Sequence, residues 1–201
     1  MINMESKMKI QIISITIIVG FLTSCISMQQ MHGAQVVPEG EKEVVIGVSV
    51  LPILVNEDGE SAALSVIQYN ARKGVHSRLD YGYHIYLPAS FEFSDEGESS
   101  FQPLIPAGGI DFKFQFFEGD KIDLAINAGL EVAIPASINF GLIAGGDKSY
   151  ASFHVHIDEW NSYLYSLTFG RKTENMIYEL RLPISPDEML VVPVLSIGFI
   201  K

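Results

Sequence analysis

The sequence predicts an all-β protein, a single antiparallel up-and-down β-barrel of about ten strands, with about 8 to 12 as the range. Three observations predict this fold. Apolar and polar residues alternate with period two through most of the chain after residue 42. Short connections of turn-forming residues separate the alternating segments. Neither a helical period nor a repeat of 20–50 residues interrupts the series, so one domain is the economical interpretation.

The start of the chain has the pattern of an export signal instead. Lys7 and Lys9 precede the apolar run 10–22, which suits a secretory signal better than a retained helix of roughly 20 apolar residues. The run ends at Leu22-Thr23-Ser24-Cys25, and Cys25 is the only cysteine. A lipidated Cys25 is expected here, with a free or buried thiol as the alternative. We therefore expect a signal peptide at 1–24, a lipidated tether at 25–41 and a barrel domain at 42–201.

The composition excludes some classes of function. Without residues 1–24, which contain Glu5, Lys7 and Lys9, the net charge falls from −11 to −12. Nucleic acid is therefore not an expected partner, because phosphate binding requires clustered cations. The chain is 48% hydrophobic and only 18% charged, against about 25% charged in ordinary soluble domains. Part of its surface is therefore expected to face lipid.

The alternation begins directly after the tether. Three successive segments carry apolar residues at every second position, with polar or small residues between them, and each is a predicted strand. Their apolar faces are Val44, Ile46, Val48 and Val50; Ile67, Tyr69 and Ala71; and Leu79, Tyr81, Tyr83, Ile85 and Leu87.

The clearest hairpin lies in the middle of the chain. Segments 110–116 and 122–132 both alternate, and Glu118-Gly119-Asp120-Lys121 joins them as a tight turn. Five further segments complete the series. Their apolar faces are Ile138, Phe140 and Leu142; Ala151, Phe153, Val155 and Ile157; Tyr163, Tyr165, Leu167 and Phe169; Met176, Tyr178, Leu180 and Leu182; and Val191, Leu195, Ile197 and Phe199.

The connection lengths support a barrel with two different ends. Connections 52–62 and 88–106 are long, and connections 73–77 and 118–121 are short. Long outer loops and short inner turns alternate in this way in membrane barrels. The later connections are too similar in length to discriminate.

Alternation alone fits two architectures, a soluble barrel or sandwich with the apolar face buried and a membrane barrel with that face outward. Three observations favour the membrane barrel. Many segments reach the 9–11 residues that a tilted spanning strand needs, whereas soluble strands average about 5–6. Aromatic residues lie on the apolar face, often near segment ends. The opposite face is rich in glycine and serine, which suits a narrow, filled lumen.

Together these features resemble a small bacterial outer-membrane β-barrel with a lipoprotein-type signal. The resemblance rests on Leu22-Thr23-Ser24-Cys25, on the turn and strand 74–82, and on the terminal strand that ends Gly198-Phe199-Ile200-Lys201. It implies an outer-membrane location in the bacterial envelope, membrane lipid as a partner and handling by the outer-membrane assembly machinery. The chain departs from the family in one respect, since such barrels often end on an aromatic residue and two residues follow Phe199.

The polar face of the strands then becomes the lumen. Charges of both signs would meet there, and the simplest interpretation is a structural network of paired groups that fills a narrow barrel. A pore or ligand passage is the alternative. The predicted lumen network is Arg72, Asp80, His84, Asp111, Lys113, Asp123, Glu131, His154, His156, Glu179 and Arg181.

His154 and His156 are the sharpest local pair in this set. Two positions apart on one strand, their imidazoles point the same way and could share a metal with His84 or Glu131, or simply hydrogen-bond carboxylates. A lipid hydrolase would need Ser152 or Ser166 as nucleophile and Glu179 or Asp123 to orient the histidine. Nothing in the spacing selects such a triad. The sequence therefore predicts no cofactor, no metal and no catalytic residue.

The expected function is that of a non-enzymatic outer-membrane barrel lipoprotein. Envelope structure, surface interaction or limited passage of small solutes would each suit it. The alternatives are a membrane-tethered soluble β-barrel that binds an apolar ligand inside its buried face, and a barrel enzyme that acts on lipid.

Overall fold

The computed structural model describes residues 31–55, 61–93, 99–103, 105–132, 136–158, 162–184 and 193–201. The predicted signal peptide and Cys25 lie outside these ranges. The described residues form eleven β-strands. They are β1 (Lys42–Val55), β2 (Ser61–His76), β3 (Leu79–Phe93), β4 (Ser99–Pro103), β5 (Ala107–Phe117), β6 (Asp123–Val132), β7 (Ser137–Gly145), β8 (Ser149–Asp158), β9 (Tyr163–Lys172), β10 (Met176–Ile184) and β11 (Val194–Ile200).

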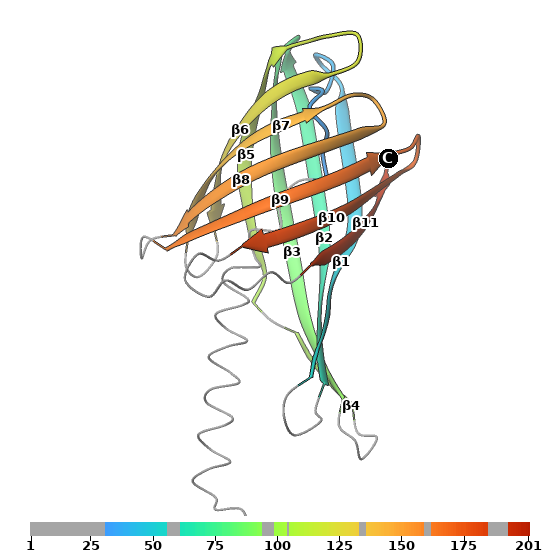
Figure 1. Cartoon of the computed structure of the whole chain (residues 1–201), viewed down its shortest axis with the longest axis vertical. Coiled ribbons are helices and arrows are strands. Elements are labelled where there is room, and N and C mark those ends of the chain that lie inside the picture. Colours follow the sequence, from blue (N-terminus) through green and yellow to red (C-terminus); the bar gives the residue numbers. More distant parts are fainter. Residues whose placement is uncertain are drawn as a thin grey trace, which may run out of the picture.

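Ten of these strands close into a ring (Figure 1). Each pairs antiparallel with its sequence neighbours, β3 pairs with β5, and β1 pairs with β11 to close the seam. The predicted all-β, up-and-down barrel of about ten strands is therefore confirmed. The remaining strand, β4, pairs only with the far end of β3.

The strand limits differ from the prediction around the long connections. Segment 88–106 was expected to be one irregular loop, but it contains the end of β3 and the whole of β4, paired from Ala89↔Pro103 to Phe93↔Ser99. β1 and β2 likewise continue into the predicted loop 52–62, pairing as far as Val55↔Ser61. Pro88 lies inside β3, and Pro103 is the last residue of β4.

The connections define two unlike ends of the barrel. We call one end the short-turn mouth, at residues 77–78, 118–122, 146–148 and 173–175. We call the other the long-loop mouth, where the connections from β1 to β2, from β3 and β4 to β5, and from β10 to β11 are made. The later connections follow this alternation only in part. Residues 146–148 and 173–175 are short and 185–193 are longer, but connections 133–136 and 159–162, at the long-loop mouth, contain four residues each.

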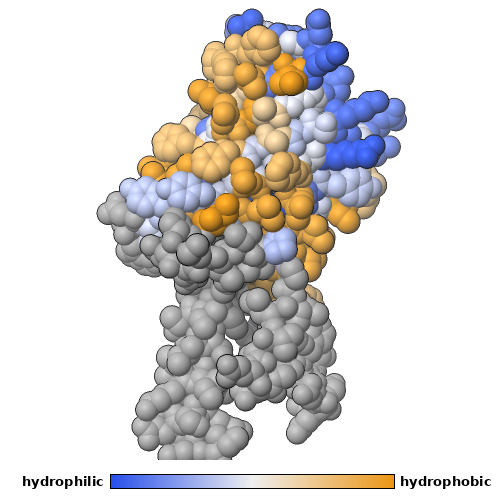
Figure 2. Space-filling model, viewed as in Figure 1, coloured by the Kyte–Doolittle hydropathy of each residue, from blue (hydrophilic) through white to orange (hydrophobic). Residues whose placement is uncertain are grey.

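The outer surface of the ring is apolar (Figure 2). Side chains at alternate strand positions point outward and are exposed, and in the described strands charged residues occupy such positions only near the short-turn mouth, at Lys42, Lys73 and Arg171. The outward set includes Ile46, Val48, Val50, Ile67, Tyr81, Tyr83, Ile85, Leu87, Ile110, Phe112, Phe114, Ile126, Leu130, Phe140, Leu142, Phe153, Phe169, Tyr178, Leu195, Ile197 and Phe199.

The inner positions are mainly polar, with small apolar clusters between them. One such cluster is Leu51, Val66, Tyr86, Ala107 and Val194. A soluble barrel of this size would bury its apolar face and expose its polar one, and the observed arrangement is the reverse. The protein is therefore a membrane-type barrel with its apolar face outward, as predicted, and the soluble alternative is wrong.

In the described part of the chain, no helix combines the length and the hydropathy needed to cross a membrane.

Candidate functional site: the polar lumen

All eleven residues of the predicted lumen network point into the barrel and are buried. Their exposed fractions range from 0% at Asp80 and Glu131 to 6% at Arg181. Strand pairing brings most of them into two separate groups, one on the wall β2–β6 and one on the wall β8–β10. Asp123 stands apart, because its Oδ1 accepts the Gly119 N–H at 3.2 Å and so closes the turn between β5 and β6.

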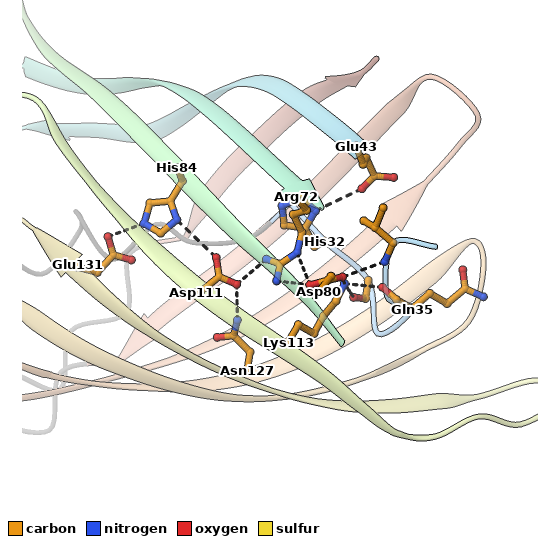
Figure 3. A network of polar contacts seen from close by, with 12 residues as sticks. His32, Gln35, Glu43, Arg72, Asp80, His84, Asp111, Lys113, Asn127 and Glu131 are labelled. Carbon is orange, nitrogen blue, oxygen red and sulfur yellow. Dashed lines mark hydrogen bonds and ion pairs between the residues drawn. The ribbon is translucent and has the colours of Figure 1, made fainter. Parts of the chain in front are cut away.

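Arg72 is the centre of the group on β2–β6 (Figure 3). Its Nε and Nη2 both donate to Asp80 Oδ1, at 2.9 and 2.5 Å, and its Nη1 donates to Asp111 Oδ1 at 2.5 Å. Gly82 lies between Arg72 and Asp111 on the wall, and a Cβ there would come within 3.0 Å of Arg72 Nη1 and Asp111 Oδ2. A guanidinium presents several donors in a fixed plane, so it can serve two carboxylates at once.

The network continues from Asp111 toward the long-loop mouth. Asn127 Nδ2 donates to Asp111 Oδ1 at 2.7 Å. His84 lies between two carboxylates, with Nε2 2.8 Å from Glu131 Oε2 and Nδ1 3.7 Å from Asp111 Oδ2. Each buried charge on this wall therefore has a partner of opposite sign or a hydrogen bond, as burial in a low-dielectric interior requires.

Lys113 connects this network to residues before the first strand. Its Nζ lies 3.3 Å from Asp80 Oδ2, and it also donates to the carbonyl oxygens of Gly33 and Gln35, at 3.1 and 2.5 Å (Figure 3). The residues on either side of these carbonyls, His32 and Ala34, are buried as well. Residues 31–37, which the sequence analysis assigned to the tether, thus lie inside the barrel at the short-turn mouth. No sequence signal marked them, since they have no periodicity and no motif.

The wall β8–β10 holds a smaller group. The Tyr150 hydroxyl donates to Glu179 Oε1, Arg181 Nη2 lies 3.7 Å from Glu179 Oε2, and Arg181 Nε donates to Thr168 Oγ1 at 3.2 Å. Tyr150 was not among the predicted site residues. Tyr150 lies at the same alternate positions of β8 as His154 and His156, and this spacing could have identified it as a lumen residue.

His154 and His156 do lie side by side, with ring centroids 6.1 Å apart. Neither ring nitrogen of His154 has a hydrogen-bond partner among the described residues, and neither does His156 Nδ1. His84 and Glu131, the two residues considered as a possible third ligand, instead contact each other, and His84 also lies near Asp111. Among the described residues there is no group of three His, Cys, Asp or Glu side chains arranged to hold a metal.

The serines beside these histidines do not form a nucleophile and base pair. Ser152 and Ser166 are buried in the lumen, but the two nitrogens of His154 accept or donate no hydrogen bond to either hydroxyl in the described structure. A triad requires nucleophile, base and orienting carboxylate in hydrogen-bonded sequence. Among the described residues, Ser152, Ser166 and His154 are therefore not hydrogen-bonded to one another.

A cavity of about 810 Å³ opens at the short-turn mouth. Residues 33 and 35–38 line it on the lumen side, and the turn residues Glu118, Asp120, Lys121 and Asp147 form part of its rim. Gln35 reaches across it, since its Nε2 donates to Asp147 Oδ1 at 2.5 Å. The N-terminal segment is thus the floor of this cavity.

Comparison with known proteins identifies no family. No family model matches the chain, and no curated protein matches it. Among solved structures, the chain is similar to the KdgM porin in complex with disordered oligogalacturonate, with 6% sequence identity, a TM-score of 0.38, and coverage of 78% of this chain and 98% of that one. A second KdgM porin structure gives 7% identity, a TM-score of 0.34, and coverage of 79% and 97%. Similarity at this level does not bear on the function of this chain.

Proposed function

We propose that this protein is an outer-membrane β-barrel lipoprotein of the bacterial cell envelope that has no catalytic activity. Its role is structural or in surface interaction, with passage of small solutes limited by a filled lumen. Lipid around the barrel and acyl chains on Cys25 would both hold it in the membrane.

The apolar outer face is the single observation that carries this proposal. Large side chains such as Phe112, Phe140 and Phe199 are each more than half exposed. Exposed apolar patches on soluble monomers rarely exceed a few hundred Å², whereas here they surround the ring. Hydrocarbon is the environment in which such a surface costs no free energy, and a closed ring leaves no strand edge unpaired within it.

The filled lumen supports a role other than wide-channel transport. About eight strands give an interior that side chains fill, and about 16–18 leave an aqueous channel. The ten strands here enclose both the paired charges and residues 31–37. The polar, occupied interior also disfavours the binding of an apolar ligand inside the barrel.

The test separates anchoring by the barrel from anchoring by the lipid. The chain is expressed with Cys25→Ser behind an ordinary cleavable signal, and washed envelopes are extracted with carbonate and then with detergent. We expect the protein to need detergent and to migrate differently on gels before and after boiling. Release into the carbonate supernatant would contradict the proposal.

Lipidation itself needs a separate measurement. Cys25→Ala in the natural precursor should block processing at residues 22–25, so that the uncleaved form accumulates and no labelled palmitate is incorporated. Normal processing of this variant would overturn the lipoprotein assignment while leaving the barrel untouched.

The outer-membrane assembly machinery is the proposed partner during biogenesis. The seam between β1 and β11 joins the two ends of the chain, from Val45↔Ile200 to Val50↔Leu195, so the ring cannot close until the last strand has been delivered. Depletion of the assembly machinery should therefore leave the chain unfolded and protease-sensitive. Unchanged levels of the folded form would contradict this partner.

A further inference from the structure

The segment 31–38 belongs to no strand, yet four of its eight residues are buried. Met31 and Ala34 are fully buried, and His32 and Val37 expose only 4% and 7% of their surface. After Pro38 the chain reverses into β1 through Gly40, whose φ of 83° lies in the left-handed region that favours glycine. The Gly40 N–H donates to Gly74 O at 3.1 Å, which ties this turn to β2.

The wall binds this segment mainly through its backbone. Lys113 Nζ donates to two of its carbonyl oxygens, as described above. Asp80 Oδ2 accepts the Val37 N–H at 2.9 Å, and Gln115 Oε1 accepts the Val36 N–H at 3.3 Å. Side chains of β3 and β5 thus bind two carbonyl oxygens, of Gly33 and Gln35, and two N–H groups, of Val36 and Val37. These strands together form a binding site for a peptide backbone.

Glycines on the wall make room for the segment at two places. Gly47 and Gly198 are opposite each other across the seam between β1 and β11, and a Cβ on Gly47 would come within 2.6 Å of Met31 Cε. On β2, a Cβ on Gly74 would overlap the carbonyl oxygens of Val37 and Pro38, which are its nearest neighbours. The wall therefore fits this segment. At Gly74, the atoms that leave no room for a Cβ belong to the backbone of the segment itself.

The described part of the lumen contains buried polar atoms that lack hydrogen-bond partners. Gln68 on β2 is opposite Gly47, where Met31 packs. Among the described residues, its Oε1 has no partner, nor do Asn70 Nδ2 and, farther toward the long-loop mouth, both amide atoms of Asn139. Buried groups of this kind are normally satisfied by water. A lumen lined by them would hydrate once the segment no longer closed the short-turn mouth.

We propose that residues 31–38 are a plug, bound as a built-in peptide ligand at the short-turn mouth, and that its displacement opens a passage for small hydrated solutes. This inference rests on the proposed function, because passage across a membrane requires the barrel to span one. Binding of the plug and insertion of the barrel are nevertheless separable by experiment.

Plug binding is tested by cysteine labelling in the Cys25→Ser chain. Val37→Cys reports on the buried plug, and Glu39→Cys, at an exposed position just beyond it, shows the rate for a free site. We expect a water-soluble maleimide to label Val37→Cys at least about tenfold more slowly than Glu39→Cys, because labelling requires local opening. Equal rates would overturn the plug, whether or not the barrel is in a membrane.

Gly74→Ala is the displacing variant, since its new methyl group meets the plug backbone. Gly129→Ala is the matched control, because its Cβ would meet Asp111, Ile110 and Asn139 on the wall and no plug residue among its nearest neighbours. We expect Gly74→Ala to raise the labelling rate of Val37→Cys by about tenfold or more, and Gly129→Ala to leave it within about twofold. The same rise in both variants would point to a loosened barrel and contradict the specific role of the plug.

Passage is measured on the lipidated full chain in liposomes that contain a small sugar or KCl. The wild-type protein should give little flux, and both Gly74→Ala and a deletion of residues 31–37 should raise it by about tenfold or more. The deletion serves as the second variant, and heat-modifiable migration shows that its barrel still folds. A folded deletion variant with wild-type flux would overturn the gating role, even if the barrel itself proved to be membrane-integral.

Discussion

The charged residues on one wall of the lumen form a continuous network, whereas the histidines on the other wall lack most of their hydrogen-bond partners among the described residues. On β2–β6, Arg72, Asp80, Asp111 and Lys113 are linked by contacts of 2.5–3.3 Å. On β7–β10, both nitrogens of His154 and both amide atoms of Asn139 have no partner among the described residues. The well-paired wall is also the one that binds the N-terminal segment.

This difference indicates which part of the lumen is built for a fixed state. Paired buried charges specify one arrangement, because loss of one partner leaves the other desolvated. Unpaired amide and imidazole groups leave room for water instead. The charged network on β2–β6 is thus fixed in one arrangement, whereas the unpaired amide and imidazole groups, which include Gln68 and Asn70 on β2, can accommodate water.

The largest expected effect is the loss of Arg72. Arg72→Leu leaves Asp80 and Asp111 buried without their shared cation, so the free energy of unfolding should fall by about 3–5 kcal/mol. Urea titration of the barrel in detergent, followed by heat-modifiable migration, measures this. Arg181→Leu on the other wall is the comparison, and an equal loss there would remove the distinction between the walls.

Gly141→Ala tests the packing around His154 on the wall β8–β10. A Cβ at position 141 would overlap the imidazole ring of His154, and overpacking of this kind costs about 1–3 kcal/mol. His154→Ala should restore most of the loss in the double variant, as a double-mutant cycle would show. Additive losses in the cycle would mean that Gly141 is needed for another reason.

Acid should weaken the plug through His32. Burial lowers the pKa of His32 from 6.5 to about 4, although Glu43, with Oε1 3.4 Å from Nδ1, opposes the shift, while Arg72 and Lys113 reinforce it. A displaced His32 takes up a proton more readily than a bound one, so binding is strongest above pH 6.5 and weakens as the pH falls toward 4.

The labelling rate of Val37→Cys, corrected for the pH dependence of the thiol with Glu39→Cys, should therefore rise between pH 7 and pH 4.5. His32→Gln removes the titrating group and should flatten this rise. A rise that survives in His32→Gln would assign the acid response to another group.

The smallest effect is expected at His156. The Nδ1 of the buried His156 has no hydrogen-bond partner among the described residues. Removal of an unsatisfied buried polar atom is nearly neutral or stabilising, so His156→Leu should change the unfolding free energy by less than about 1 kcal/mol. The same urea titration checks it. A fall in the unfolding free energy as large as that of Arg72→Leu would contradict this and show that the His156 side chain makes a stabilising contact.

Most of the barrel could be predicted because each strand position reports on its environment. The period-two pattern of segments such as 110–116 gives the strand and its faces together, and the short connections between successive segments indicate antiparallel neighbours. The sequence also predicted which face of the strands points outward, because glycine and serine opposite an apolar face suit a narrow interior. The predicted strand limits were wrong around residues 88–106, where β3 continues past Pro88 and β4 ends at Pro103. Prolines are tolerated at the edge of a sheet, and β4 is such an edge.

The residues that face the lumen could be predicted only from their alternate positions along each strand. Alternation placed Arg72, His84 and Glu179 inside, but which of them meet depends on the register of strands far apart in sequence, as in the contact between Arg72 and Asp111. The plug was invisible for a further reason. Most of its hydrogen bonds to the wall are made by its backbone and not by its side chains. The amino-acid composition of residues 33–37 therefore does not indicate that they bind inside the barrel.

The most direct test of the central claim, that the apolar face meets lipid, is fluorescence quenching by brominated lipid. Trp160 is the only tryptophan, so Trp160→Phe with Phe140→Trp places one reporter at an outward position of β7 that is 52% exposed. Bilayers brominated at mid-chain should quench this tryptophan strongly, and aqueous iodide should not. Strong quenching by iodide with none by brominated lipid would show that this face meets water.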